Sequence, residues 1–590
     1  MGRPQRVIEM SVSITPQRGE APAPYGAPSE SMQRARANGP LRTLIAMIVM
    51  ALAFMAVGAQ LVRLALPGQS EITSSLSETV SGSYARPDIV DRNGRLLASD
   101  VEAYSLFADP ARVLYRDEIV EKLASVFPDL DRNAVRRDLA DRSRRFVWIR
   151  RGLSPRTAQE VHNLGLPGLD FRRELRRAYP GGTLAGHVLG YVNIDNRGVT
   201  GIERYVDDSL GVDAVLSATP TERAPVRLSL DLGVQHAVES ELADAMRRFE
   251  AKGAAGIVLD ANTGEVLASA SFPEVDPARP AMSLDTARAD KVAGSTFELG
   301  SVFKTVTLAL VLEGGYAKLD TVLDVRQPLA AGAFTIRDLH PAGRPLSVAE
   351  VFVHSSNVGA AMLATRVGPQ KLQAFLHQLG LLTPMQTEEG PIASPQLPSR
   401  WGQVETMTIA YGHGLAVSPL QFAAAASALL NGGHKVEPTF LKRAPDAEPA
   451  KAVALVSAAT SGRMRELMRL NVTDPAGTGK RAAVPGYSIG GKTGTAEIPG
   501  PGGYRERAVI SSFLAAFPID KPKYLVFVLL FEPKPTHAAG GEVLAALNAA
   551  PTTGRIIARI GPVLGMMSAS AAGASGVAFD GTLSAKYEAQ

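Results

Sequence analysis

The sequence predicts an α+β protein in which an antiparallel sheet is flanked by helices and carries a helical subdomain. An N-terminal membrane helix and an α+β spacer domain precede this part of the chain. Three observations support the fold class. Residues 43–62 form an apolar run without charges, hairpin signals stand near both ends of the segment 226–567, and the stretch between those hairpins has a largely helical pattern.

Length and composition limit the kinds of function. At 590 residues the chain is long enough for two or three domains. Its hydrophobic content of 45% and charged content of 20% are typical of a globular protein. A net charge of +4 gives no support for nucleic-acid binding. The absence of cysteine excludes disulfides, cysteine-ligated zinc and thiolate catalysis, which leaves a serine, acid-base or non-enzymatic role.

The N-terminal segment indicates a membrane anchor. Residues 1–42 are rich in Pro, Ala, Gly, Ser and Arg, and we expect a disordered arm. The apolar run 43–62 has the length of about 20 residues that a helix needs to span a hydrocarbon core. Residues 57–59 resemble a signal-peptidase site, so cleavage after Ala59 is an alternative to a retained anchor.

The distribution of arginines predicts the orientation of this anchor. Arg34, Arg36 and Arg42 precede the apolar run, and after Arg63 no Lys or Arg occurs until Arg86. Because positive charge stays on the cytoplasmic side, the arm is expected to be cytoplasmic and the rest of the chain to be exported.

Residues 63–225 are expected to form a non-catalytic domain of short helices and strands. Residues 91–94, Asp-Arg-Asn-Gly between two apolar runs, are typical of a hairpin turn. The segment is basic but contains no grouping of residues with evident catalytic chemistry, which favours a structural role.

Residues 226–567 carry the clearest pattern of secondary structure. An amphipathic helix is predicted around residues 234–249, and hairpins are predicted to turn at 262–264 and 520–523. The apolar periodicity of 543–564 predicts a closing helix. Residues 568–590 are small and polar, and we expect a disordered tail.

A serine and a lysine at helical spacing form the first candidate catalytic pair. Ser301 follows Gly300 and precedes an apolar stretch that ends at Gly314, so it is expected at a helix N-terminus, where developing negative charge is favoured. Lys304 lies on the same face, and burial of this apolar helix would favour its neutral, proton-accepting form. An N-capping serine beside an ordinary helix lysine is the structural alternative.

Two further groupings could contribute polar side chains. In "HSSN", Ser355 and Asn357 could offer a hydroxyl and an amide from one turn, although the same letters are common in helix caps. The stretch "GYSIGGKTGTAE" contains a G-x-S-x-G serine motif at Ser488. The glycines that follow Ser488 exclude the strand-turn-helix elbow such a nucleophile needs, so its second half is expected to form a strand edge.

That strand edge is suited to binding an extended peptide. Lys492 offers a point charge to a carboxylate, and Thr493 and Thr495 offer hydroxyls. Gly494 is expected to let a ligand backbone approach, and an extended peptide could pair with the edge by strand addition.

Taken together, Ser-x-x-Lys, Ser-x-Asn and Lys-Thr-Gly in this order resemble the active-site set of penicillin-binding proteins and serine β-lactamases. The chain is more narrowly similar to the class B penicillin-binding proteins, from the anchor to about residue 564. The resemblance includes "RPDIVDRNGRLLASD", "RAYPGGTLAGHVLGYV" and "YGHGLAVSPLQFAAAASALLNGG". "KTGTAE" resembles the septal (FtsI) type more than the elongation type.

The resemblance implies a penicillin-binding transpeptidase fold and a peptidoglycan D,D-transpeptidase activity in septal wall synthesis. It implies a dimerisation-type pedestal domain at 63–225 and a transpeptidase domain at 226–567. Ser301 would attack acyl-D-Ala-D-Ala and would be acylated by β-lactams, and Lys304 would be the general base. Ser355 would relay protons, and Asn357 would hold the substrate amide.

For the remaining positions, the resemblance assigns binding roles. Lys492, Thr493 and Thr495 would bind the substrate carboxylate, and the backbone N–H groups of Ser301 and Thr495 would form the oxyanion hole. No metal or other cofactor is implied.

The implied partners are peptidoglycan stem peptides on lipid-linked nascent glycan, a SEDS-family (FtsW-like) polymerase and other division proteins. The catalytic domain would lie in the periplasm on a single-pass inner-membrane anchor. A polymerase partner is expected because no glycosyltransferase domain fits between residues 62 and 301. Leu299 and Val302 depart from the common Pro-Gly-Ser-Thr-x-Lys form of the first motif without removing a reacting group.

Four other interpretations account for part of the same pattern. An elongation-type transpeptidase, a membrane β-lactam sensor, and a β-lactamase or carboxypeptidase would share the fold, and the single span and the pedestal disfavour the last two classes. A phosphate-binding P-loop at "AGTGKRA" is excluded because Lys480 is followed by Arg481 rather than Ser or Thr.

Overall fold

The computed structural model describes residues 44–45, 47–57, 86–210, 224–444, 453–500, 503–535 and 542–566. The chain divides into two compact units, residues 1–82 and 83–590. In the first unit, residues 44–57 are helical except at position 46, which is not described, and their large apolar side chains are exposed. The expected arm 1–42 and tail 568–590, and part of the expected span 43–62, lie outside the described residues. Within the described part of the chain, no helix has the length and apolarity needed to cross a membrane.

The second unit begins with a sheet in which β2 pairs antiparallel with β1, β3 and β4, while the short β5 pairs parallel with β1. The predicted turn at 91–94 joins β1 to β2. Asp91 Oδ1 stabilises this turn by accepting from the N–H groups of Asn93 and Arg95. Three helices cover one face and share a small apolar core with β2 and β3. The bounds are β1 Ile89–Val90, β2 Leu96–Ala108, β3 Val147–Leu153, β4 Leu169–Ala178, β5 Val226–Arg227, α4 Arg116–Val126, α5 Arg132–Ala140 and α6 Pro155–His162.

A five-stranded antiparallel sheet of order β14-β15-β16-β6-β7 organises the rest of the unit. The hairpins predicted at 262–264 and 520–523 are its β6–β7 and β15–β16 connections, and β14 forms an edge. The strands are β6 Gly253–Asp260, β7 Val266–Phe272, β14 Gly490–Gly500, β15 Gly503–Phe517 and β16 Tyr524–Phe531.

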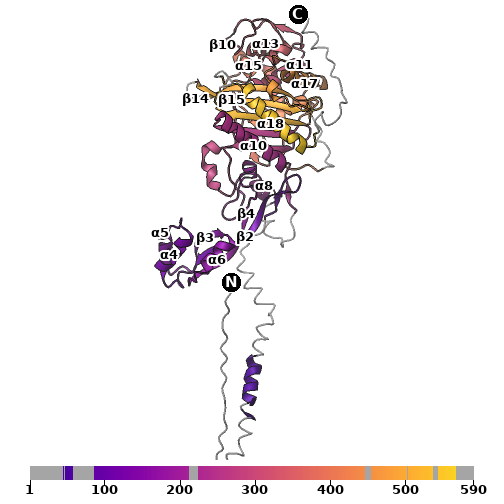
Figure 1. The fold of residues 1–590 in the computed structure, drawn as a ribbon. Coiled ribbons are helices and arrows are strands. Elements are labelled where there is room, and N and C mark those ends of the chain that lie inside the picture. Colours follow the sequence, from indigo (N-terminus) through magenta and orange to yellow (C-terminus); the bar gives the residue numbers. More distant parts are fainter. Residues whose placement is uncertain are drawn as a thin grey trace, which may run out of the picture. The chain divides into compact units, whose positions relative to one another are not determined.

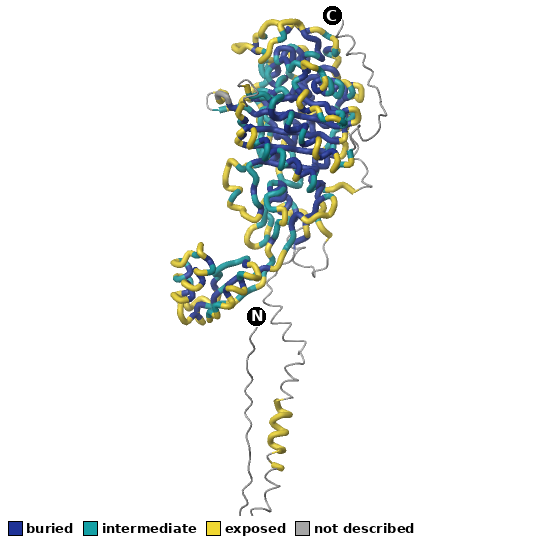
Figure 2. Tube along the Cα trace, in the orientation of Figure 1, coloured by how far each residue is buried: buried dark blue, intermediate teal, exposed yellow. Residues whose placement is uncertain are grey.

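Both faces of this sheet are covered, as β16 shows by its alternation. Its residues Leu525, Phe527 and Leu529 belong to the core on one face, and Val526, Val528 and Leu530 to the core on the other. Helices α10 Leu232–Phe249 and α18 Ala549–Val563 pack on the second face, and α11 Lys304–Glu313, α16 Pro419–Leu430 and α17 Ala458–Thr473 lie on the first (Figure 1). Figure 2 shows the strands between these layers as the most buried part of the chain. The predicted α+β fold with a helical subdomain is confirmed.

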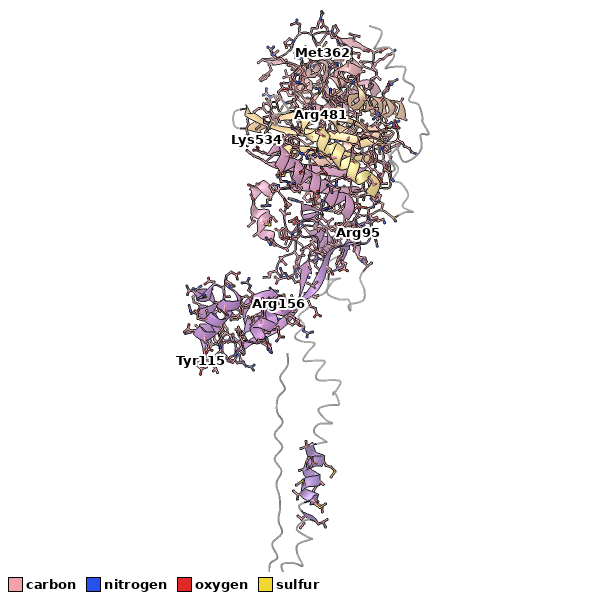
Figure 3. All side chains as sticks on the ribbon, viewed as in Figure 1. Arg95, Tyr115, Arg156, Met362, Arg481 and Lys534 are labelled. Carbon is pink, nitrogen blue, oxygen red and sulfur yellow. The ribbon has the colours of Figure 1, made fainter. Side chains whose placement is uncertain are left out.

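Shorter elements complete the unit. The expected closing helix begins later than the apolar pattern suggested, because a 3₁₀ turn comes first and Asn548 caps α18 by accepting from the Ala549 N–H. In Figure 3, the labels Tyr115 and Arg156 mark the region of α4 and α6, and Met362 marks α13. The remaining helices are α7 Gly186–Leu189, α8 Gly201–Leu210, α12 Val348–Val353, α13 Asn357–Val367, α14 Pro369–Gln378 and α15 Gln403–Ile409. The remaining strands are β8 Val322–Leu323, β9 Leu329–Ala331, β10 Phe334–Ile336, β11 Leu346–Ser347, β12 Gln386–Thr387 and β13 Gly390–Pro391, and the 3₁₀ turns are η1 Pro280–Leu284, η2 Thr286–Arg288, η3 Gly300–Phe303, η4 Lys480–Ala482 and η6 Ala545–Leu547.

The apolar core continues across residue 225, the position at which the sequence suggested a domain boundary. Ile89, Val188 and Ile202 belong to the same core cluster as the first face of the five-stranded sheet. A buried ion-pair network lies beside them, in which the Glu203 carboxylate contacts both Arg177 and Arg86. The part of the N-terminal domain nearest the large sheet is therefore packed as one body with it.

Candidate active site

Three segments that are distant in the sequence meet beside the edge strand β14. They are the turn η3 with the start of α11, the junction between α12 and α13, and β14 itself. The side chains that meet are Ser301, Lys304, Ser355, Asn357 and Lys492, linked by the hydrogen-bond distances given below.

Ser301 lies in η3, where the chain turns into α11. Gly300 has a φ of +59°, and a Cβ on this residue would come within 2.5 Å of the Thr495 carbonyl oxygen. Both the backbone conformation and the neighbouring strand therefore exclude a side chain at position 300. The Gly300 N–H donates to the Gly412 carbonyl at 3.2 Å. These contacts place the backbone before Ser301 directly against β14.

Lys304 is the first residue of α11, and its side chain is completely buried. Its Nζ lies 2.9 Å from Ser301 Oγ, 2.7 Å from Asn357 Oδ1 and 2.5 Å from the Ser355 carbonyl oxygen. Burial, followed by the charge of Lys492, lowers the pKa of Lys304 well below its usual value. A lysine in this environment can accept the proton of a nearby hydroxyl at neutral pH.

Ser355 joins α12 to α13 in a left-handed conformation, with a φ of +59°. Such a conformation is unusual for a residue with a side chain and is found where surrounding contacts enforce it. The Ser355 Oγ lies 3.1 Å from Lys304 Nζ and 2.9 Å from Lys492 Nζ. The hydroxyl therefore bridges the two lysines.

Lys492 lies on β14 and is also completely buried. Besides Ser355, its Nζ donates to the Thr493 carbonyl at 3.1 Å and lies 5.6 Å from the centre of the Phe352 ring. Burial lowers the pKa of Lys492 to about 7. Both protonation states of this amine are therefore accessible at neutral pH.

The remaining residues of the third motif follow along β14. Thr493 Oγ1 lies 2.7 Å from Thr478 Oγ1, and Thr495 Oγ1 accepts from the Ala545 N–H at 3.4 Å. Gly494 was expected to admit a ligand backbone. On the side where a Cβ would project, protein atoms fill the space, since a Cβ would lie 2.7 Å from the Leu299 carbonyl oxygen and 2.5 Å from Ser512 Oγ. The glycine is required by the packing of η3 against the strand.

Ser488 stands apart from these contacts. It precedes β14 in a segment without a helix, and its carbonyl accepts from the Ile519 N–H at 2.8 Å. The elbow geometry that the sequence argument excluded does not occur at this position.

Sequence reasoning missed two polar residues at the site. Thr478, within the stretch rejected as a P-loop, places its hydroxyl against Thr493 and donates to Asn471 Oδ1 at 2.9 Å. Asp338 contacts the start of α13 with both carboxylate oxygens. Neither residue belongs to one of the three motifs, so only the folded contacts reveal them.

Comparison with known proteins covers most of the chain. Residues 254–551 match the family model of the penicillin binding protein transpeptidase domain, and residues 83–212 match that of the penicillin-binding protein dimerisation domain. A probable peptidoglycan D,D-transpeptidase FtsI from Caulobacter vibrioides is 40% identical over 489 residues, which cover 82% of each chain. The probable peptidoglycan D,D-transpeptidase PenA from Neisseria meningitidis is 34% identical over 78% of this chain and 82% of its own.

The fold has a match among solved structures. The crystal structure of penicillin binding protein 3 from Mycobacterium tuberculosis, complexed with aztreonam, has a TM-score of 0.62 and a sequence identity of 28%. The match covers 82% of this chain and 97% of that chain.

Proposed function

Because the chain belongs to the class B penicillin-binding proteins, peptidoglycan D,D-transpeptidases of the FtsI type, we propose that Ser301 is the nucleophile and Lys304 its general base. One observation carries this assignment. The Lys304 amine is fully buried, has a lowered pKa and lies 2.9 Å from Ser301 Oγ. A neutral amine at this distance can take the hydroxyl proton as the oxygen attacks a carbonyl carbon.

The acylation step follows from these positions. Ser301 Oγ forms an ester with the carbonyl carbon of the penultimate D-Ala, and its proton passes to Lys304. The bond to the terminal D-Ala breaks, and the departing amine receives a proton. Ser355 is the relay for that proton, because its hydroxyl contacts both Lys304 and Lys492. An amine of a neighbouring stem peptide then attacks the ester, loses its proton and restores the Ser301 hydroxyl, which closes the cross-link.

Strand β14 supplies the binding surface in this proposal. Within the described residues β14 pairs with a strand, β15, on one side only, so an extended stem peptide can add to the sheet on the other side. Lys492, Thr493 and Thr495 bind the terminal carboxylate, and Asn357 orients the substrate amide. The contact of Gly300 with Thr495 supports an oxyanion hole made by the N–H groups of Ser301 and Thr495, at about 3 kcal/mol of transition-state stabilisation for each donor.

The cellular setting is part of the same proposal. We infer septal synthesis from the FtsI relative, a single N-terminal anchor from the apolar run 43–62, and a periplasmic catalytic domain from the arginines before that run. We also propose a domain division at residues 225 and 226, between the two family matches, with the continuous core as the interface of the two domains. A SEDS-family polymerase is proposed as the partner that makes the glycan strands. Co-purification of a polymerase from detergent extracts, and its loss when residues 1–62 are removed, would test the anchor and the partner together.

Labelling with a fluorescent penicillin tests the chemical assignment. The wild-type protein should form a covalent adduct, Ser301→Ala should form none, and Ser488→Ala should label at the wild-type rate. Peptide mapping should place the adduct on Ser301. Continued labelling of Ser301→Ala, or loss of labelling in Ser488→Ala alone, would overturn the assignment.

A further inference from the structure

Asp338 accepts hydrogen bonds from the start of α13, although it lies outside the three motifs. It lies just after β10, and its side chain reaches the junction at which Ser355 and Asn357 stand. Its Oδ1 accepts from the backbone N–H groups of Asn357 at 2.6 Å and Val358 at 3.0 Å. Its Oδ2 accepts from the Ser356 hydroxyl at 2.7 Å. The carboxylate therefore caps N–H groups that the first turn of the helix leaves without partners.

These contacts hold Asn357 in place on several sides. Ser356 Oγ, which donates to Asp338, also accepts from the Gly359 N–H at 2.9 Å. The Asn357 Nδ2 donates to the carbonyl of Arg337, the residue before Asp338, at 3.3 Å. With its backbone and its amide both fixed, Asn357 presents Oδ1 to Lys304 Nζ at 2.7 Å. The capping carboxylate thus sets the position of a direct neighbour of Lys304.

The charge of Asp338 acts on the same lysine. Three ionisable groups on other elements act electrostatically with Lys304, namely Lys492 on β14, His413 on the loop after α15, and Asp338. Burial lowers the pKa of His413 to about 4, so this ring is neutral at pH 7. Lys492 and burial lower the pKa of Lys304, whereas Asp338 raises it. Among these groups, Asp338 is the one that favours a proton on Lys304.

We propose that Asp338 is a positioning residue for the transpeptidase reaction, whose carboxylate both fixes Asn357 beside Lys304, directly and through Ser356, and supplies negative charge near that buried lysine. The inference rests on the proposed role of Lys304 as the base. An amine that must take a proton from Ser301 and later release it needs a basicity that burial alone would remove. A fixed carboxylate near the site restores part of the basicity of the Lys304 amine.

The substitution Asp338→Asn separates charge from geometry. The asparagine Oδ1 can still accept from the two backbone N–H groups, and its Nδ2 can donate to Ser356 Oγ. Without the charge, Lys304 is harder to protonate, so the acidic limb of the acylation profile should move to lower pH by about half a unit to one unit. The plateau should fall because a weaker base removes the Ser301 proton less effectively.

The measurement is the second-order rate constant for acylation of the purified full-length protein by a fluorescent penicillin, from pH 5 to pH 9. A matched control is Asp324→Asn, which removes an exposed carboxylate that pairs with Arg326 in the same subdomain and should leave the profile unchanged. Thermal unfolding of each variant confirms that the compared proteins are folded.

Two outcomes would overturn the proposal. If Asp338→Asn lowers the plateau but leaves the acidic limb where the wild type has it, the residue has only a structural role. If the variant matches the wild type throughout, it has neither role. A wrong assignment of Lys304 as the base would give a different result. The pH profile of the wild type would then contain no acidic limb that the substitution Lys304→Arg removes.

Discussion

Lys492 Nζ lies 2.9 Å from Ser355 Oγ, although 137 residues separate them in the chain. This single contact joins the edge strand of the sheet to the helical subdomain at the point where Ser355 adopts its left-handed conformation. Lys492 is buried and Ser355 is conformationally constrained. Small changes in either the sheet or the helical subdomain should therefore alter the acylation rate.

Replacing Lys304 by arginine should abolish rapid acylation. Arginine is permanently protonated at neutral pH, unlike the neutral amine proposed for Lys304, so it cannot act as the base. The acylation rate constant should fall by about 10² to 10⁴-fold, the usual contribution of a general base. Lys318→Arg, at an exposed position that follows the same helix, is the matched control and should acylate normally. A Lys304→Arg protein that stays within tenfold of the wild type would contradict the proposed base.

Stability should increase with pH because of Lys492. Its pKa is lowered from 10.5 to about 7 in the folded protein, so between these values the unfolded chain binds a proton that the folded protein does not. The free energy of unfolding should therefore rise with pH in this window, by at most about 1.4 kcal/mol per pH unit from this group. Below about pH 7 the contribution of this group no longer changes.

Denaturant unfolding of the wild type and Lys492→Met at several pH values from 7 to 9.5 measures this effect. The methionine variant should lack the slope that Lys492 supplies, so its stability relative to the wild type should decline as pH rises. Lys521→Met, at an exposed position, is the control. Parallel pH dependences for wild type and Lys492→Met would show that the lysine is not buried as described.

Gly300→Ala should impair acylation more than a comparable glycine substitution. Gly300 and Gly315 both have positive φ, +59° and +67°, so an alanine at either position carries a similar backbone strain of about 1 kcal/mol. Only at position 300 would the added Cβ meet the strand, 2.5 Å from the Thr495 carbonyl oxygen, whereas Gly315 has no atom within 4 Å of that point.

The two alanine variants are compared by acylation rate and by thermal unfolding. Gly315→Ala should lose some stability and acylate at the wild-type rate, whereas Gly300→Ala should lose more stability and acylate at least tenfold more slowly because the turn η3 is displaced. Equal rates for the two variants would mean that the contact between η3 and β14 does not position Ser301.

Glu203→Gln should destabilise the N-terminal domain strongly. The Glu203 and Arg177 side chains are both fully buried, and Glu203 also contacts Arg86. Removing the negative charge leaves Arg177 with Asp100 and Arg86 with Asp207 as their remaining carboxylates, so the loss of the shared buried partner should cost about 3 kcal/mol, the lower end for a broken buried pair. Asp208→Asn breaks an exposed pair with Arg204 on the same helix and should cost less than about 1 kcal/mol. Urea unfolding of the two variants should show this difference, and similar midpoints would argue against a buried network.

Local patterns in the sequence were sufficient to predict the α+β fold, the hairpins and the apolar helix after Ser301, because hydrophobic periodicity and turn residues act over a few positions. The three motifs could be recognised together because each is a short string of residues. The packing requirement at Gly494 could not be predicted, since nothing in the letters "KTGT" shows that Leu299 and Ser512 occupy the space beside it.

The sequence by itself determined which side chains could react, namely a serine, its lysine and the polar groups of two further motifs. Only the tertiary structure decided that Lys304 and Lys492 share the Ser355 hydroxyl, that Asp338 caps the helix bearing Asn357, and that the core crosses residue 225. The physical reason is that burial, electrostatic coupling and capping depend on groups brought together over long stretches of chain. Such groups have no fixed spacing along the sequence, so their effect on protonation appears only once the layers are packed.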